Sequence, residues 1–168
     1  CPITVIPNGV DLDYFCPSSS PREDRTLVLT GKMSYHANVT AAMYFVQEVL
    51  PLVWSEIPDV RFEIVGKDPP EKIQRLACDE RIRVTGYVDD LRPYLAHATA
   101  AVCPVQYAVG IQNKVLEAMS CAKPVLCTSF AIEGIGAESV HVADTAAVRE
   151  EYVSLERHAV PVPARHLQ

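Results

Sequence analysis

Residues 100–119 read Ala-Ala-Val-Cys-Pro-Val-Gln-Tyr-Ala-Val-Gly-Ile-Gln-Asn-Lys-Val-Leu-Glu-Ala-Met. The apolar run over residues 100–105 is typical of a parallel strand that is buried on both faces. The remainder predicts a helix that opens at Gly110 and continues to Met119. Because Lys114 follows Gly110 by four residues and precedes Glu117 by three, we expect all three residues to share one helical face.

This helical face offers three kinds of group to a single ligand. The N-terminus of a helix presents backbone N–H groups and, together with a lysine, suits a phosphate. A carboxylate one turn later suits sugar hydroxyls, so the pattern favours a nucleoside diphosphate site, with a nucleotide sugar as ligand. The alternative is that Lys114 and Glu117 only form an exposed i,i+3 ion pair on an amphipathic helix.

Apolar runs alternate with segments of helical periodicity along the rest of the chain. This alternation indicates βαβ units and a parallel sheet, with right-handed crossovers that place helices on both faces. The sequence therefore predicts an α/β fold, a Rossmann-like three-layer α/β/α domain with a parallel sheet of about six strands. The predicted strands are residues 26–31, 61–66, 82–86, 100–105, 123–128 and 139–143, after a short lead-in strand over residues 3–6. The predicted helices are residues 39–57, 71–78, 90–98, 110–119 and 146–157.

Two residues shape the expectation for the first long helix. Asn38 is a good N-cap, so we expect the helix to begin directly after it. Pro51 lacks a backbone N–H and its ring clashes with the preceding turn, so it should kink or divide the helix.

Four of the predicted strands end in informative loops, namely Gly31-Lys32, Gly66-Lys67, Gly86-Tyr87 and residues 107–110. In an open parallel sheet, ligands bind at the carboxyl ends of the strands, near the reversal of strand order. We therefore expect these loops to line one rim. His36 and Tyr107 fall on the same rim, where a solvated histidine and a packing tyrosine are simpler accounts than contacts with a phosphate or a nucleotide.

Composition restricts the classes of function. The chain has 168 residues, enough for one domain, and its formal net charge of −6 disfavours broad binding of nucleic acid or anionic membranes. No run approaches the ~20 apolar residues of a membrane span. The six cysteines form no C-x-x-C pair and no zinc-type spacing, which favours free thiols in a reducing cytosol. We therefore expect no metal, no nucleic-acid partner and a cytoplasmic location.

Well-known phosphate-binding and hydrolase motifs are absent. No G-x-G-x-x-G follows the first strand, where Gly31 stands alone before Lys32, and no G-x-x-x-x-G-K-[ST] loop exists. No G-x-S-x-G elbow supports a hydrolase. Phosphate binding is therefore assigned to the segment at Gly110 together with Lys114, with Lys32 as a second cation.

Several segments occur together in an ordered set. They are Val5-Ile6-Pro7-Asn8-Gly9-Val10-Asp11, Phe62-Glu63-Ile64-Val65-Gly66, Val84-Thr85-Gly86-Tyr87-Val88, and Lys114-Val115-Leu116-Glu117-Ala118-Met119 with Lys123-Pro124-Val125. The set resembles the C-terminal, donor-binding half of retaining GT-B glycosyltransferases of group 1. Residues 30–33 and 110–114 look most like the sugar transferases associated with exosortase-type exopolysaccharide systems. The likeness runs from about residue 2 to about residue 136.

The resemblance implies roles for the matching positions. Glu117 would accept hydrogen bonds from ribose hydroxyls. Independently of the resemblance, the place of Glu133 after the fifth predicted strand, on the ligand side, leaves open whether it touches donor hydroxyls or only begins a helix. Lys114 and Lys32 are the implied catalytic residues, since they would stabilise charge on the departing diphosphate. The other implied substrate-binding residues contact the diphosphate or edge the base pocket, mostly through their backbone: Gly31, Gly86, Tyr87, Val88, Gly110, Ile111 and Gln112.

The resemblance also implies an enzyme larger than this chain. Residues 1–25 would be a linker and lead-in strand from a missing N-terminal acceptor domain, residues 26–145 the nucleotide-sugar-binding domain, and residues 146–168 a C-terminal helix and irregular tail. The enzyme would transfer a hexosyl-type sugar from a UDP or GDP type donor, with retention and without a cofactor. The acceptor would be a glycan or lipid-linked glycan in exopolysaccharide or cell-envelope synthesis. The chain alone is expected to be inactive, and the missing half would bring it to the inner face of the membrane.

The sequence departs from the larger family at two places in the expected site. Val109 stands where that family often has the first of two glutamates, and Ala37 and Asn38 stand near its second lysine. Two other functions remain open, a nucleotide-sugar epimerase of GT-B fold and a non-catalytic Rossmann-like interaction module. A response-regulator-like module would need an aspartate at the end of the first strand, where Thr30-Gly31 stand.

Overall fold

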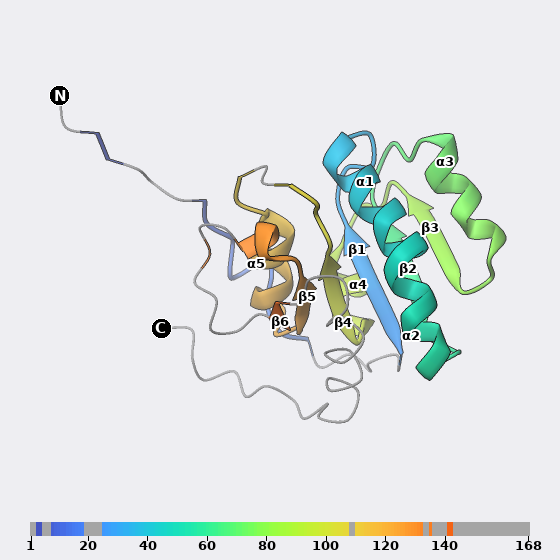
Figure 1. Cartoon of the computed structure of the whole chain (residues 1–168). Coiled ribbons are helices and arrows are strands. Elements are labelled where there is room, and N and C mark those ends of the chain that lie inside the picture. The colour runs from blue at the N-terminus through green and yellow to red at the C-terminus, as the bar shows by residue number, and fades with distance from the viewer. Residues whose placement is uncertain are drawn as a thin grey trace.

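The centre of the fold is a six-stranded parallel sheet in the order β3-β2-β1-β4-β5-β6 (Figure 1). The computed structural model describes residues 3–4, 8–18, 25–107, 110–132, 135 and 141–142. The strands are β1 (Thr26–Thr30), β2 (Arg61–Val65), β3 (Ile82–Gly86), β4 (Ala100–Cys103), β5 (Val125–Cys127) and β6 (His141–Val142). All six lie within or overlap the predicted strand ranges.

Side chains of the central strands pack on both faces of the sheet. Because successive residues of a strand point to opposite faces, Leu27 and Leu29 of β1 enter one core cluster while Val28 enters the other. All five residues of β1 are buried. A sheet that is apolar on both faces needs a helical layer on each, so the predicted three-layer α/β/α arrangement is confirmed.

One long helical segment follows β1 and divides into three parts. These parts are α1 (His36–Tyr44), a π-helical turn (Phe45–Val49) and α2 (Leu50–Glu56), and Figure 1 shows α1 and α2 across one face of the sheet. Pro51 lies in the first turn of α2, where its missing N–H is tolerated, and the N–H of Leu50 bonds to the carbonyl of Phe45. The predicted division at Pro51 is therefore confirmed.

The start of this helix differs from the sequence prediction. The N-cap is Tyr35, whose backbone is extended (φ −82°, ψ 122°) and whose side chain makes no capping bond. Asn38 is therefore the third residue of α1 and not its cap. Its amide has other partners, which are described below.

The remaining helices are short. They are α3 (Glu71–Gln74), which continues as a 3-10 turn (Arg75–Cys78), α4 (Arg92–His97), α5 (Asn113–Ser120) and a 3-10 turn (Ser129–Ile132). Ile73 of α3 packs in the cluster with Leu27, whereas Leu95 of α4 and Val115 of α5 pack in the cluster with Val28. The helices α1 to α3 therefore cover one face and α4 and α5 the other, as right-handed crossovers require. Residues 3–4 are not in a strand, and the predicted helix over residues 146–157 lies outside the described residues.

The order of the strands reverses between β1 and β4. From β1 the chain moves outward to β2 and β3, and from β4 it moves outward in the other direction to β5 and β6. The loops that leave the carboxyl ends of β1 and β4 lead to the starts of α1 and α5. Sheets of this order bind ligands at this switch point.

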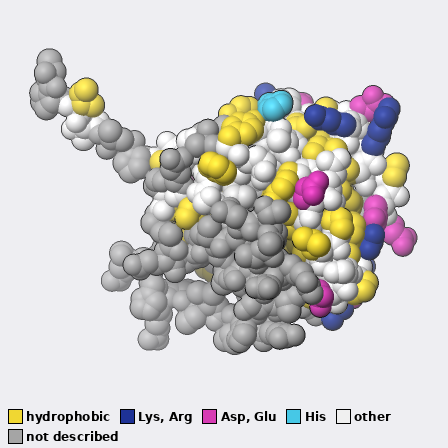
Figure 2. Space-filling view, viewed as in Figure 1, with side chains coloured by type: hydrophobic (Ala, Val, Ile, Leu, Met, Phe, Trp, Pro, Cys, Tyr) yellow, Lys and Arg dark blue, Asp and Glu magenta, His cyan; other side chains and the backbone are white. Residues whose placement is uncertain are grey.

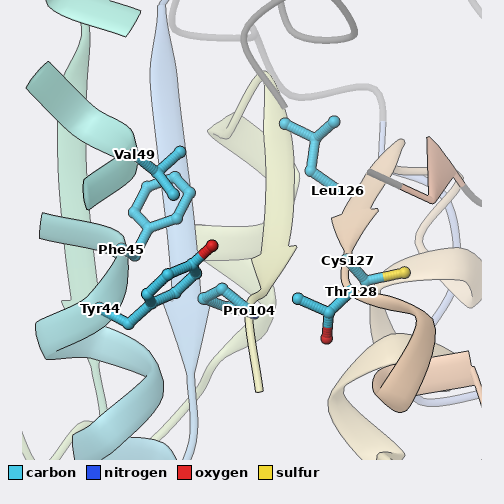
Figure 3. A pocket seen from close by; sticks show the side chains of 7 residues that line it. All are labelled: Tyr44, Phe45, Val49, Pro104, Leu126, Cys127 and Thr128. Carbon is cyan, nitrogen blue, oxygen red and sulfur yellow. The ribbon is translucent and has the colours of Figure 1, made fainter. Parts of the chain in front are cut away.

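A small apolar pocket lies on the α1 face, beside the π-helical turn (Figure 3). It is lined by Tyr44, Phe45, Val49, Pro104, Leu126, Cys127 and Thr128. Because no charged side chain lines it, this pocket does not suit a phosphate. On the face seen in Figure 2, charged side chains gather along the edge near α3 and β3. Within the described part of the chain, no helix has the length and apolar character needed to cross a membrane.

Candidate functional site

The ends of β1, β2 and β3 are joined by backbone hydrogen bonds into one rim. The N–H of Gly31 donates to the carbonyl of Val65 at 3.0 Å, and the N–H of Gly66 donates to the carbonyl of Gly86 at 3.1 Å. The N–H of Met33 donates to the carbonyl of Lys67 at 2.8 Å. The prediction that these three loops line one rim is confirmed. Residues 108–109 of the fourth loop lie outside the described residues.

Lys114 reaches across the switch point from α5 to α1. Its Nζ donates to Asn38 Oδ1 at 2.8 Å and to Gln112 Oε1 at 3.0 Å. Gly31 leaves room for this arrangement, because a Cβ atom there would lie 2.8 Å from Asn38 Nδ2 and 3.4 Å from Lys114 Cε. The structure therefore brings together Gly31, Gln112 and Lys114 from the predicted set and adds Asn38.

The simple ion-pair alternative for Lys114 is wrong. No ion pair joins it to Glu117, and among the described residues no hydrogen bond or salt bridge holds the Glu117 carboxylate. Glu117 is half-buried, and burial raises the pKa of its carboxyl group, an effect that the nearby Lys114 ammonium partly offsets. The carboxylate is thus partly desolvated without an internal donor, which leaves its oxygens available to accept hydrogen bonds from a ligand.

Gly110 does not belong to the helix that Lys114 and Glu117 share. It has a φ of 77°, in the left-handed region, and α5 begins three residues later, at Asn113. Gln112 is the N-cap, and its Nε2 donates to the carbonyl of Gly110 at 2.9 Å. The prediction that Gly110 opens the helix is therefore wrong, although Gly110, Ile111 and Gln112 do form the loop directly before it.

The second predicted cation stands at the exposed edge of the rim. The side chain of Lys32 is exposed, and no hydrogen bond or ion pair from the described residues holds its ammonium. Its carbonyl accepts hydrogen bonds from the Tyr35 N–H and from Asn38 Nδ2. Lys32 is therefore near the Asn38 amide through its backbone, while its ammonium remains in solvent.

The residues expected to edge a base pocket lie at the end of β3. Gly86 has a φ of 72°, Tyr87 is 70% exposed, and Val88 packs against the core cluster that contains Val28. Three strand spacings separate β3 from β4, which is about 14 Å across the sheet. The structure therefore places these residues at one end of the rim and Lys114 near the other. Glu133 lies outside the described residues.

His36 and Tyr107 form a contact that the sequence reading missed. Nδ1 of His36, the first residue of α1, lies 2.8 Å from the phenolic oxygen of Tyr107, which follows β4. This hydrogen bond crosses the switch point beside the Lys114 contact. His36 is exposed to solvent, as expected, but it begins α1 instead of lying in a loop, and its ring has Tyr107 as a partner.

Asn38, which the sequence predicts only as a helix cap, is a further site residue that contacts Lys114. No signal in the sequence marks this role, because the hydrogen bond between Asn38 and Lys114 joins residues 76 positions apart.

The lead-in segment, residues 8–15, packs against the same side of the fold as α4 and α5. Asn8 Nδ2 donates to Asn113 Oδ1 at 3.0 Å, and Phe15 packs in the core cluster with Val28. The guanidinium of Arg92 lies 4.1 Å from the centre of the Tyr14 ring. These contacts attach the segment to the first residue of α5, Asn113, and to the first residue of α4, Arg92.

Another group of charged residues lies away from the rim. Glu63 of β2 is buried and accepts hydrogen bonds from Arg83 Nη1 at 3.2 Å and lies 2.9 Å from His97 Nε2. The group connects the sheet to α4 and has no part at the carboxyl ends of the strands. In the described ranges, no cluster of three or more His, Cys, Asp or Glu side chains is arranged to hold a metal ion. The described cysteines are all free thiols.

Comparison with solved structures identifies several similar folds. TarM matches with a TM-score of 0.69 and 16% identity, over 90% of this chain and 31% of that chain. HepE of Anabaena, solved with UDP and glucose, matches with a TM-score of 0.66 and 17% identity, over 92% and 46% of the two chains. AviGT4, a glycosyltransferase of avilamycin A biosynthesis, matches with a TM-score of 0.66 and 19% identity, over 92% and 48%.

These structures share a Rossmann-like GT-B glycosyltransferase fold with the chain, which spans about a third to a half of their length. A search of curated protein sequences finds no match. The family model for glycosyl transferases group 1 matches residues 24–156, which is most of the sequence. The chain therefore belongs to the group 1 glycosyl transferases.

Proposed function

We propose that this chain is the donor-binding domain of a retaining glycosyltransferase and holds a nucleoside-diphosphate sugar at the switch point between β1 and β4. The observation that carries the proposal is the fixed position of the Lys114 ammonium between Asn38 and Gln112. A partly desolvated cation at the carboxyl ends of parallel strands is well suited to a diphosphate. Because the chain belongs to the group 1 glycosyl transferases, a nucleoside-diphosphate sugar is the best-supported source of this diphosphate.

Each neighbouring group has a role in the proposal. Lys114 binds the diphosphate and, together with Lys32 and the backbone of Gly110, Ile111 and Gln112, stabilises the charge that develops as the diphosphate departs. Glu117, which has no internal donor, accepts hydrogen bonds from the ribose hydroxyls. The reaction requires no bound cofactor or metal in this proposal, because the cations come from the chain itself.

The base end of the donor lies along β3 in the proposal. Gly86, Tyr87 and Val88 line this part of the rim, Gly31 lies at the diphosphate end beside Lys114, and Glu133 contacts donor hydroxyls. HepE of Anabaena was solved with UDP-glucose and the pneumococcal transferase GtfA with UDP and GlcNAc, which supports a UDP-type donor over a GDP-type donor.

Two further elements come from the family resemblance. The sugar is transferred with retention to an acceptor glycan or lipid-linked glycan, in exopolysaccharide or cell-envelope synthesis. The acceptor binds to a second, N-terminal domain, so the 168-residue chain alone binds donor without transferring it. The family assignment argues against a response-regulator-like module, and no feature of the described residues favours an epimerase.

Titration with UDP, GDP and ADP tests the proposal. Amide NMR spectra would follow Gly110, Ile111 and Gln112, calorimetry would give the affinities, and UMP, GMP and AMP would serve as ligands that lack the second phosphate. We expect one of the three diphosphates to bind, to shift these amides and to bind more tightly than its monophosphate. If none of the three diphosphates binds, the proposed function is wrong.

A further inference from the structure

Two buried side-chain amides surround the Lys114 ammonium, and their orientation is fixed. Asn38 is 6% exposed and Gln112 is 7% exposed. Asn38 Nδ2 donates to the carbonyl of Lys32 at 3.0 Å, and Gln112 Nε2 donates to the carbonyl of Gly110 at 2.9 Å. Because backbone carbonyls only accept hydrogen bonds, each NH₂ group must face its carbonyl, and each amide oxygen is left to face Lys114.

The two amides satisfy only part of the ammonium. A lysine ammonium carries three N–H donors. Two of these donors bond to Asn38 Oδ1 and Gln112 Oε1, and no third partner occurs among the described residues. The remaining donor is therefore available to an acceptor that the chain itself does not provide.

The chemical type of the two partners also matters. A carboxylate at either position would form an ion pair with Lys114 and cancel most of its positive charge. An amide is neutral, so it fixes the ammonium by hydrogen bonds and leaves its full charge for an anion. This pair of contacts comes from both sides of the switch point, Asn38 from α1 and Gln112 from the loop before α5.

We propose that Asn38 and Gln112 are positioning residues that hold the Lys114 ammonium in place for a diphosphate without neutralising it. This inference rests on the proposed function, which supplies the diphosphate. It assigns a role to two side chains that contact Lys114 and that act on the ligand through it.

Isosteric charge substitutions test this inference. In Asn38→Asp and Gln112→Glu, the shape and the acceptor for Lys114 are retained while a negative charge is added. We expect UDP and inorganic pyrophosphate each to bind at least about tenfold more weakly to both variants, by calorimetry. Asn38→Asp should also bind UDP and pyrophosphate more weakly than Asn38→Ala does. A role in packing alone would give the opposite order, because Ala removes more of the side chain than Asp does.

A matched control comes from Gln74 on α3. Its exposed side chain also donates through Nε2 to a backbone carbonyl, that of Pro69, at 2.7 Å. Gln74→Glu therefore makes the same chemical change and breaks the same kind of hydrogen bond. We expect its affinities for UDP and inorganic pyrophosphate to stay within about twofold of those of the original chain.

A measurement on the original chain keeps the test independent of how well the variants fold. An ammonium held by two buried amides exchanges its protons slowly, so ¹⁵N NMR should show a resolved lysine Nζ signal that Lys114→Met removes. If no such signal is seen, the proposed arrangement is wrong.

The remaining outcomes are also decisive. If the original chain binds UDP, GDP or ADP but Asn38→Asp and Gln112→Glu bind it as Gln74→Glu does, the inference fails and the proposed function stands. If the original chain binds none of these nucleotides and no pyrophosphate, both fail together.

Discussion

The carbonyl oxygen of Gly31 occupies the space that a side chain on Gly66 would need. A Cβ atom on Gly66 would lie 1.8 Å from that oxygen, and Gly66 has a φ of 152°, which residues with side chains rarely adopt. The obstructing atom belongs to the backbone, so a small rotation of a side chain cannot relieve the contact. The close approach of these two loops therefore depends on glycine at position 66.

Gly66→Ala should destabilise the fold strongly. Because the new methyl group would force apart the ends of β1 and β2, we expect the free energy of unfolding to fall by at least about 3 kcal/mol. Urea denaturation followed by circular dichroism measures this change. Gly9→Ala is the control, since a Cβ atom at Gly9 has no atom within 4 Å, and it should change the value by no more than about 0.5 kcal/mol. Equal midpoints for the two variants would contradict the prediction.

Lys114→Met should remove most of the affinity for the diphosphate while keeping the length of the side chain. A charge-assisted hydrogen bond contributes about 1.5–3 kcal/mol, so we expect nucleoside diphosphate binding to weaken roughly 10- to 150-fold. Calorimetry at two salt concentrations measures both the affinity and its salt dependence.

Lys72→Met, an exposed position on α3, serves as the control for a lost positive charge. We expect it to bind the diphosphate with unchanged affinity. If both lysine variants weaken binding to the same extent, general charge attraction explains the affinity, and the Lys114 position does not.

Glu117→Gln should raise stability at neutral pH and weaken ligand binding. Burial raises the pKa of Glu117 above its ordinary value of 4.5, so the stability connected with its neutral form is complete below pH 4.5. That stability is lost as the pH rises through the raised pKa, where the desolvated carboxylate forms. We therefore expect Glu117→Gln to melt at a higher temperature than the original chain at pH 7, with the difference vanishing toward pH 4.

In Glu117→Gln the ribose hydroxyls would also lose a charged hydrogen-bond acceptor. We therefore expect this variant to bind the nucleoside diphosphate more weakly at pH 7. Glu48→Gln, at an exposed position in the π-helical turn, is the matched control and should show neither effect. A lower melting temperature for Glu117→Gln at pH 7 would show that the carboxylate stabilises the fold, against this prediction.

Asp90→Asn should lower the free energy of unfolding, because it removes a charged partner of Arg92 and Tyr14. Hydrogen bonds from Arg92 lower the pKa of Asp90 to about 2, and Tyr14 donates a further, long hydrogen bond at 3.4 Å. A lowered pKa means that the stabilisation is present above the ordinary value of 3.8 and is lost as the pH falls through about 2. Because the pair is partly exposed, we expect a loss of about 0.5–1 kcal/mol at pH 7.

Thermal denaturation between pH 2 and pH 7 checks this expectation, with Asp13→Asn, also exposed, as the control. The difference in melting temperature between Asp90→Asn and the original chain should decrease steadily as the pH falls. A difference that is independent of pH would mean that the ion pair is not its source.

The sheet could be predicted because its signals are local. Residues 27–29 are apolar and point to both faces of the sheet, as the side chains of a central parallel strand must, and Gly31 marks the end of the strand. Pro51 likewise acts through its own covalent structure, so the division of the first helix followed from its position in the sequence.

The details of the site could not be predicted because they depend on contacts between distant residues. The hydrogen bond from Lys114 to Asn38 joins residues 76 positions apart, and no periodicity in the sequence encodes it. The side-chain amide of Asn38 bonds to Lys114 and to the Lys32 carbonyl. Helix-capping rules predict instead that this amide caps the start of the helix, a position that Tyr35 occupies. Similarly, Gly110 has a left-handed backbone that is not helical, so α5 begins at Asn113 and not at Gly110 as the sequence predicts.

The contact between Asn8 and Asn113 has a mechanical consequence. Asn113 is joined by one peptide bond to Lys114, and Asn8 belongs to a segment that is anchored further along by Phe15. A displacement of Asn8 would therefore reach the backbone of Lys114 through a single side-chain hydrogen bond and one peptide bond. The position of residues 8–15 and the position of the Lys114 backbone are therefore coupled through the first residue of α5.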